Sequence, residues 1–316
     1  MSNEKSVPKS VGKRKKINWK HYLPYYLFAL PGVIYMICNN YLPMFGIVIA
    51  FKKLNFRKGI FGSDWAGFEN FKFLFASKDA WSITRNTLLY NIAFIVLTTV
   101  LAVVVAILIN EIRSRVASKL YQSLILIPYL MSWVIVSYLG YAMLSGETGL
   151  INNMILKPLG LAPVSWYNTP KYWPFILVFV HLWKTVGYAM IIYYSSIVGI
   201  SQDYYEAATL DGASKWQQIK SITLPLLKPT MITMLVLQVG RIFYSDFGLF
   251  YQVPMNSGTL YSVTRTIDVY VYNALMKSSD FGMSSAASVY QSIVGFVMIV
   301  AVNALIRKTS KENALF

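Results

Sequence analysis

Long apolar runs separated by polar or charged segments dominate this chain of 316 residues. A helix that crosses a bilayer needs about 20 mostly apolar residues. Six runs reach that length, so the pattern predicts an all-α membrane protein with six transmembrane helices. The expected spans lie near Leu23–Phe51, Thr87–Ile109, Leu120–Leu144, Trp173–Ile200, Thr230–Tyr251 and Ser284–Ile306.

The first apolar run is long for a single span. It contains Pro31-Gly32, Asn39-Asn40 and Pro43, and proline and glycine are typical causes of a kink in a helix. We therefore expect a kink or a break in this run. It is too long for the apolar core of a signal peptide and lacks a convincing cleavage site, so we interpret it as a retained first span.

Composition supports the membrane interpretation. The chain is 56% hydrophobic and 13% charged, whereas a typical soluble domain carries about 25% charged residues. The formal net charge is +16, but the basic residues gather at the ends of apolar runs rather than on one face, which argues against nucleic-acid binding. The single cysteine, Cys38, permits no intrachain disulfide, and we interpret it as a small buried hydrophobe.

The distribution of lysine and arginine predicts the orientation of the chain. Four basic clusters precede the first span, separate the second and third, occupy the segment after the fourth, and follow the sixth. Cytoplasmic segments carry an excess of such residues, so both termini and the segment 201–229 are expected in the cytoplasm. Basic residues between the first two spans, including Lys52, Lys53 and Arg57, oppose this orientation. We expect a basic tail at 1–22, a transmembrane domain at 23–306 and a second tail at 307–316.

The polar segment 201–229 lies between two apolar runs and has the pattern of two short helices. Ser201 is placed to cap the first helix, and Asp203 complements the positive end of its dipole. Gly212 can end that helix in a left-handed conformation. The second helix is predicted from Ser214 to about Ile222, and Pro225 and Pro229 are expected to stop it. From periodicity alone, an amphipathic helix lying on the bilayer explains the segment equally well.

The sequence of this segment resembles the EAA loop of ATP-binding-cassette importer permeases. Glu206-Ala207-Ala208 is followed by Gly212 and then by Ile222-Thr223-Leu224-Pro225, a slightly altered ending. The likeness extends over nearly the whole chain to the polysaccharide and oligosaccharide branch of binding-protein-dependent permeases. It rests on Tyr41-Leu42-Pro43-Met44-Phe45-Gly46, Ala50-Phe51-Lys52, Gly67-Phe68-Glu69-Asn70-Phe71, Arg85-Asn86-Thr87, Leu108-Ile109-Asn110-Glu111-Ile112-Arg113 and Trp183-Lys184-Thr185-Val186-Gly187.

This resemblance implies a type I ABC importer permease (MetI-like) fold with cytoplasmic coupling helices, in a bacterial cell membrane. It implies a second permease subunit, a cytoplasmic ATP-binding-cassette ATPase dimer, an extracellular solute-binding protein and a carbohydrate substrate. ATP and Mg would be bound by the partner ATPase, and this chain would need no cofactor of its own. The residues implied to contact the ATPase are Glu206, Ala207, Ala208, Asp211 and Gly212.

Charged residues inside two predicted spans mark a candidate translocation path. Burying a lysine or an arginine against lipid costs about 2.5–3.5 kcal/mol on insertion scales, so such residues are expected to face protein or water. Two polar stripes at helical spacing surround them, and groups of this kind suit a polyhydroxylated solute. Gluing helices together, or snorkelling to the interface, is the alternative role. The stripes comprise His181, Lys184, Tyr188 and Ser195 in the fourth span, and Gln238, Arg241 and Ser245 in the fifth.

Motifs for catalysis are missing from the sequence. It contains no G-x-x-x-x-G-K-[ST] motif, so we do not expect this chain to hydrolyse ATP. With only His21 and His181, it offers no zinc motif and no credible Ser-His-Asp arrangement. We therefore predict a non-catalytic permease without a metal site. One alternative is an ion-coupled secondary transporter, which would not need an EAA loop. The other is a membrane enzyme acting on lipid-linked sugars, which would need clustered acidic residues that the sequence does not show.

Overall fold

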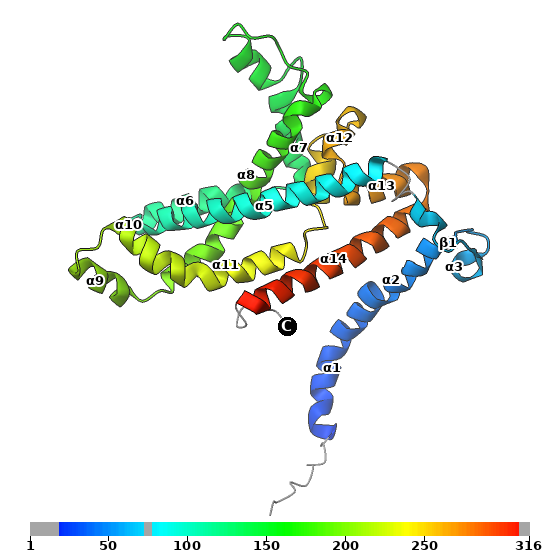
Figure 1. Cartoon of the computed structure of the whole chain (residues 1–316), viewed down its shortest axis with the longest axis horizontal. Coiled ribbons are helices and arrows are strands. Elements are labelled where there is room, and N and C mark those ends of the chain that lie inside the picture. The colour runs from blue at the N-terminus through cyan, green and yellow to red at the C-terminus, as the bar shows by residue number, and fades with distance from the viewer. Residues whose placement is uncertain (1–18, 73–77, 310–316) are drawn as a thin grey trace, which may run out of the picture. The chain divides into compact units, whose positions relative to one another are not determined.

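A computed structural model describes residues 19–72 and 78–309, so most of the two predicted tails lies outside the described residues. By their internal contacts, residues 1–48 and 49–316 form two units, each described here by itself. Nearly all of the described chain is helical, and Figure 1 shows the helices. In the first unit, α1 (Trp19–Met36) leads through a π-helical turn (Ile37–Tyr41) into α2 (Leu42–Met44) and the start of a 3-10 helix (Phe45–Phe51).

The second unit contains the remaining elements. Its long helices are α5 (Lys78–Asn110), α6 (Arg115–Leu130), α7 (Trp133–Leu144), α8 (Trp173–Val198), α11 (Leu224–Val239), α13 (Ile267–Ser278) and α14 (Phe281–Thr309). Its shorter helices are α3 (Gly59–Gly62), α9 (Gln202–Leu210), α10 (Lys215–Gln218) and α12 (Tyr261–Thr264). Two-residue strands, β1 (Lys52–Lys53) and β2 (Asp64–Trp65), pair antiparallel. Single 3-10 or π turns occupy Glu69–Phe71, Ile151–Leu156, Trp166–Asn168, Pro170–Tyr172, Ile219–Thr223, Gly248–Gln252 and Gly258–Leu260.

Within the described residues, five helices are long and apolar enough to cross a membrane, and six spans result when the bent pair of α6 and α7 counts as one. The all-α membrane fold predicted from the sequence is therefore confirmed. The first run, 22–51, is one continuous helical segment. Its predicted irregularity falls at the π turn Ile37–Tyr41, which ends two residues before Pro43. In an α-helix the proline ring would clash with the carbonyl four residues earlier, and a π turn, with its wider spacing of hydrogen bonds, suits the position before Pro43.

The third predicted span is wrong as a single helix, because α6 and α7 meet at an angle of 94°. Met131 and Ser132 between them are extended, with ψ of 141° and 152°. The Ser132 hydroxyl accepts a hydrogen bond from the Ile135 amide and so begins a new helix. The carbonyls freed at the end of α6 are bound by a side chain from α8, Lys184, as described below. An apolar pattern carries no sign of such a partner.

Two boundaries around the fifth span also differ from the prediction. Pro225 and Pro229 do not stop the second short helix, because α10, the π turn Ile219–Thr223 and α11 form one helical run of 25 residues from Lys215 to Val239. The π turn again accommodates the proline that follows it. At its far end this run stops at Val239, so the predicted continuation to Tyr251 is wrong. Residues 240–246 form turns and irregular backbone instead.

Small residues allow the central helices to approach closely. Ala102 and Ala106 of α5 pack with Ala189 of α8 in one buried cluster. At Gly187 of α8, a Cβ atom would lie 2.3 Å from the Ile125 carbonyl oxygen of α6, so only glycine fits against that backbone. Without a hydrophobic effect between helices in lipid, such close packing is the main source of association.

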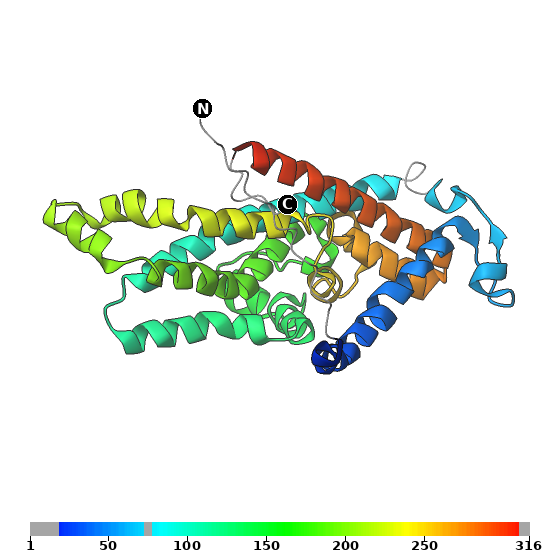
Figure 2. The ribbon, with the colours of Figure 1, turned by 90° about the horizontal axis from the view of Figure 1, so that it is seen from below.

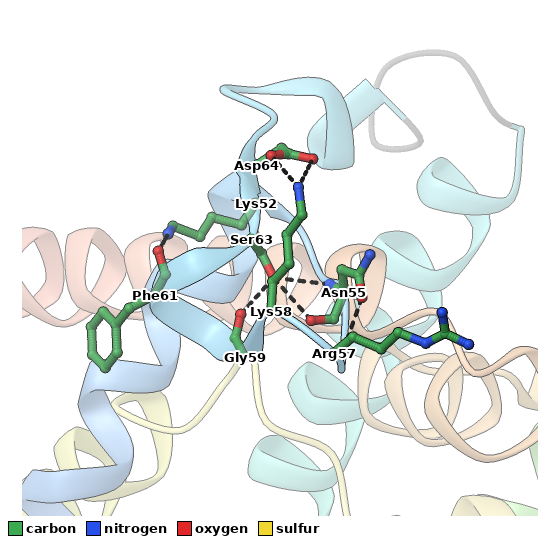
Figure 3. Close-up of polar contacts among 8 residues, drawn as sticks. All are labelled: Lys52, Asn55, Arg57, Lys58, Gly59, Phe61, Ser63 and Asp64. Atoms are coloured by element: carbon green, nitrogen blue, oxygen red, sulfur yellow. Dashed lines mark hydrogen bonds and ion pairs between the residues drawn. The ribbon is translucent and has the colours of Figure 1, made fainter.

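The segment 52–72 of the second unit is held by polar contacts and by aromatic packing, in which the Phe51 ring contacts those of Trp65, Phe68 and Phe71. Lys58 bonds the Asp64 carboxylate at 3.0 Å, and the Ser63 hydroxyl donates to the Gly59 carbonyl oxygen at 2.6 Å, as Figure 3 shows. Lys53 pairs with Glu69 at 2.8 Å. The hydrogen bond and the charge of Lys53 hold the pKa of the Glu69 carboxyl below the usual range. These contacts fold the segment back on the β1–β2 ladder.

Candidate functional site

The segment 201–229 contains the short helix α9 and the start of the longer run from Lys215, joined by a tight turn. The first helix and the glycine turn are as the sequence predicts, whereas the second helix continues beyond its predicted end. The Ser201 hydroxyl accepts from the Asp203 amide and begins α9. Gly212 follows with φ of +79°, a value that an L-residue adopts only with strain. Ser214 then begins α10 with a complete capping box, in which its hydroxyl accepts from the Gln217 amide and the Gln217 side chain accepts from the Ser214 amide.

Side-chain hydrogen bonds fix the two helices of this segment to each other and to the bundle. The buried Gln218 amide donates to the Thr209 hydroxyl oxygen at 2.9 Å, which joins α10 to α9. The Tyr205 and Thr223 hydroxyls lie 2.9 Å apart. Lys215 pairs with Glu111, just after α5, at 3.3 Å. The segment therefore has a defined tertiary structure and is not a loose connection.

The outer surface of this segment is open and partly apolar. Leu210 is 89% exposed and Trp216 is 70% exposed. Glu206, Ala207, Asp211 and Gly212 are exposed, whereas Ala208 is half-buried. No cation within the described ranges pairs with Glu206. In the second unit, both Figure 1 and Figure 2 show α9 and α10 at the end opposite α13. An exposed carboxylate beside small and apolar side chains suits contact with another protein.

A second candidate site lies where the fifth span breaks, at residues 240–246. Its backbone groups find partners on three other helices. The Asn91 amide of α5 donates to the carbonyl oxygens of Ile242 and Tyr244 at 2.8 and 3.2 Å. The Gln291 amide of α14 donates to the Phe243 oxygen at 2.6 Å. Irregular backbone at membrane depth is tolerated only where it is bonded within the protein or lines a wet cavity.

The Asp268 carboxylate of α13 completes this support. It accepts from the Ser245 amide and hydroxyl, both at 2.7 Å, and from the Gln291 side chain at 3.2 Å. Sequence reasoning missed Asn91, Asp268 and Gln291. A polar side chain inside or beside an apolar run was the available signal, but the sequence could not show that all three meet one break in another helix.

An open cavity of about 850 Å³ adjoins this break. Polar side chains from α5, α8 and the broken segment line it together with apolar ones. Asn91 and Gln291 sit near the middle of their helices, so the break faces the middle of the bundle. The residues that line the cavity are Asn91, His181, Val236, Leu237, Gly240, Arg241, Tyr244, Ser245, Asp246 and Ile299.

The structure brings three of the seven predicted path residues to this cavity: His181, Arg241 and Ser245. The His181 ring stacks on Phe94 with centroids 3.7 Å apart. Gln238 is half-buried and does not belong to the lining. Ser195 is exposed, and its hydroxyl bonds the Ile191 carbonyl of its own helix.

The other two predicted path residues meet the break between α6 and α7. Tyr188 stacks on Tyr129 with centroids 4.6 Å apart. Lys184 is only 6% exposed, and its ammonium donates to the carbonyl oxygens of Pro128, Tyr129 and Met131. These contacts correspond to the helix-joining role that the sequence left open. Whether any of the seven residues contacts a solute stays a prediction.

Comparison with known proteins places this architecture in a family. Residues 98–311 match the model of the "Binding-protein-dependent transport system inner membrane component" family. This chain belongs to that family, so the recognition made from its sequence motifs is confirmed.

The similar proteins are transport permeases. The chain is 33% identical over 288 residues to the polygalacturonan/rhamnogalacturonan transport system permease protein YteP of Bacillus subtilis (strain 168), covering 91% of this chain and 89% of that protein. It is 29% identical to the trehalose/maltose transport system permease protein MalF of Thermococcus litoralis (strain ATCC 51850 / DSM 5473 / JCM 8560 / NS-C), over 87% of this chain and 90% of that one.

Solved structures show the same fold. A chain from the crystal structure of a bacterial alginate ABC transporter, in complex with an alginate pentasaccharide-bound periplasmic protein, superposes with a TM-score of 0.85. It is 29% identical, and the match covers 95% of this chain and 99% of that one. The MetI-like permease fold expected from the sequence is therefore confirmed.

Proposed function

We propose that this protein is the membrane-spanning permease subunit of an ATP-driven importer for an oligo- or polysaccharide. The observation that carries the proposal is the two-helix segment 201–229, which presents Glu206, Ala207 and Leu210 at one end of a transport-family bundle. The named relatives transport carbohydrates, and one solved neighbour was captured with a saccharide-bound periplasmic protein. A solute-binding protein, a second permease and a separate ATPase dimer complete the proposed assembly.

The proposed orientation places both termini and the segment 201–229 in the cytoplasm, where an ATPase can reach that segment. The basic clusters before the first span and after the last support it. The ATPase binds ATP and Mg in this proposal, and the permease itself carries out no chemistry.

Helix continuity supports a direct mechanical coupling. The run from Lys215 to Val239 connects the exposed helix pair to the broken segment 240–246 without interruption. Displacement of α9 and α10 by a closing ATPase dimer would move this continuous helical run as a unit. Its far end forms part of the central cavity through Val236 and Leu237. The Lys215–Glu111 pair extends the same movement to the end of α5. Rocking of these helices would open the cavity to alternate sides.

Co-purification of the tagged chain with its associated subunits tests the docking role. We expect Glu206→Lys to reverse the charge that meets the ATPase, and Gly212→Val to strain the turn at φ of +79°. Each variant should reduce recovered ATPase by about tenfold, the effect of losing a charge-assisted contact of about 1.4 kcal/mol. Insertion into the membrane should be unchanged.

Matched controls are Glu147→Lys, an exposed carboxylate away from the helix pair, and Gly160→Val, another glycine with positive φ (+73°) and open space around it. Normal ATPase recovery and normal substrate-stimulated hydrolysis in both loop variants would refute the docking role.

A further inference from the structure

The central cavity contains one cation that the protein leaves unpaired. Arg241 lines the cavity immediately after α11 and is exposed to it. Across the two described ranges of the chain, no carboxylate and no other acceptor lies within bonding distance of its guanidinium. Burying an arginine in the middle of a membrane bundle costs free energy unless water, protein or a ligand bonds its guanidinium.

The carboxylate that shares the cavity is already engaged. The Asp246 carboxylate accepts a hydrogen bond from the Leu249 amide at 3.3 Å. Asp268, behind the break, accepts from Ser245 and Gln291. Of the two ionised side chains in the cavity lining, Arg241 is therefore the one that has no bond within the described chain.

Another side chain of the same lining suits a sugar ring. Tyr244 lines the same cavity and is 45% exposed. An aromatic face packs on the apolar face of a pyranose, while a guanidinium binds a carboxylate with two parallel hydrogen bonds. A neutral sugar has no carboxylate to accept the two parallel hydrogen bonds of the guanidinium.

We propose that the cavity selects acidic saccharides, and that Arg241 binds the carboxylate of a uronate residue as it passes. This inference rests on the proposed importer function and adds a charge requirement to it. Tyr244 holds the ring of the same residue, and Ser245 lies beside them.

Uptake by the complete transporter, reconstituted in liposomes with its binding protein and ATPase, tests the charge requirement. The two probes are trigalacturonate and its carboxyl-reduced counterpart, a neutral trisaccharide of the same linkage. We expect Arg241→Gln to lower trigalacturonate uptake by about tenfold or more, because a hydrogen bond to a charged group is lost. Uptake of the neutral trisaccharide should change by less than about twofold, within the usual effect of a substitution that removes no contact.

Arg241→Lys, which keeps the charge but not the fork, should give an intermediate loss. Lys277→Gln removes an exposed cation outside the cavity and should leave both probes unaffected. An equal loss of both probes in Arg241→Gln would assign Arg241 to a structural contact, for example with the second permease, and would overturn the charge requirement. So would wild-type uptake of trigalacturonate by that variant. Neither result would touch the importer function, which fails instead if the wild-type complex imports no member of a glycan panel.

Discussion

At the scale of single residues, a buried charge has a role that its position in the sequence leaves open. Lys184 lies in the fourth span, where lining a path and joining helices were both reasonable. Its ammonium lies 2.9 Å from the Tyr129 carbonyl oxygen and bonds two other carbonyls at the α6–α7 break. Because α6 ends there, its last carbonyls are short of intrahelical donors, although the Met131 amide still bonds the Pro128 oxygen at 3.3 Å. The lysine therefore satisfies a helix end inside the bundle.

Replacing Lys184 with methionine tests this role. The substitution keeps most of the volume but removes the ammonium donor from three carbonyl groups, of which only that of Pro128 keeps a bond, to the Met131 amide. We therefore expect a loss of stability of about 2–3 kcal/mol. The thermal unfolding midpoint in detergent should fall by several degrees. Lys171→Met, which removes an exposed cation from a different part of the chain, is the control. An unchanged midpoint for Lys184→Met would contradict the role.

At the scale of elements, the helix pair α9–α10 is the best defined part of the candidate machinery. Its caps and its glycine turn follow from residues close together in sequence, so the sequence predicts them well. The link between the two helices depends on Gln218, which is 4% exposed and reaches Thr209 across the turn. Together with the Tyr205–Thr223 contact, this link can pass a movement of α9 on to α10.

Substitution of Gln218 by leucine separates the two helices without leaving a cavity. We expect hydrogen exchange in residues 203–213 to rise, and substrate-stimulated ATP hydrolysis by the assembled transporter to fall by about three- to tenfold, since roughly 1 kcal/mol of hydrogen bonding is lost. The exposed Gln202 of α9 provides the control variant, Gln202→Leu. Wild-type exchange and hydrolysis in Gln218→Leu would show that α9 and α10 move together by other means.

At the scale of the whole second unit, the break at 240–246 is held by helices that are distant in sequence. Asn91 and Gln291, 200 positions apart in the numbering, bond carbonyls of the same short segment. Bonds of this kind let the backbone leave the helix at membrane depth. They also connect α5, α13 and α14 around the cavity. The same hydrogen bonds therefore stabilise the fold and shape the cavity.

Leucine at Asn91 or at Gln291 should orphan one or two buried carbonyls and lower stability by about 1–3 kcal/mol each. Because both side chains bond adjacent residues of one segment, the double variant is expected to lose less or more than the sum by at least about 0.5 kcal/mol. Thermal unfolding in detergent measures both effects. Thr233→Val is the matched control, since that hydroxyl bonds the Pro229 carbonyl of its own helix. Strict additivity of the two losses would argue against a shared support.

The sequence by itself determined the membrane class, the apolar runs that supply the spans, the family and the helix–glycine–helix pattern that begins at Ser201. These features depend on local composition, on hydrophobic periodicity and on caps between residues a few positions apart. Tertiary structure decided the 94° bend at Met131–Ser132, the end of the fifth span at Val239 and the grouping of Asn91, Asp268 and Gln291 around that end. An apolar residue fits lipid equally well in a straight or a broken helix. A break in a helix is tolerated only where side chains of other helices bond the backbone groups that it frees. The place where those side chains meet is a property of the folded bundle.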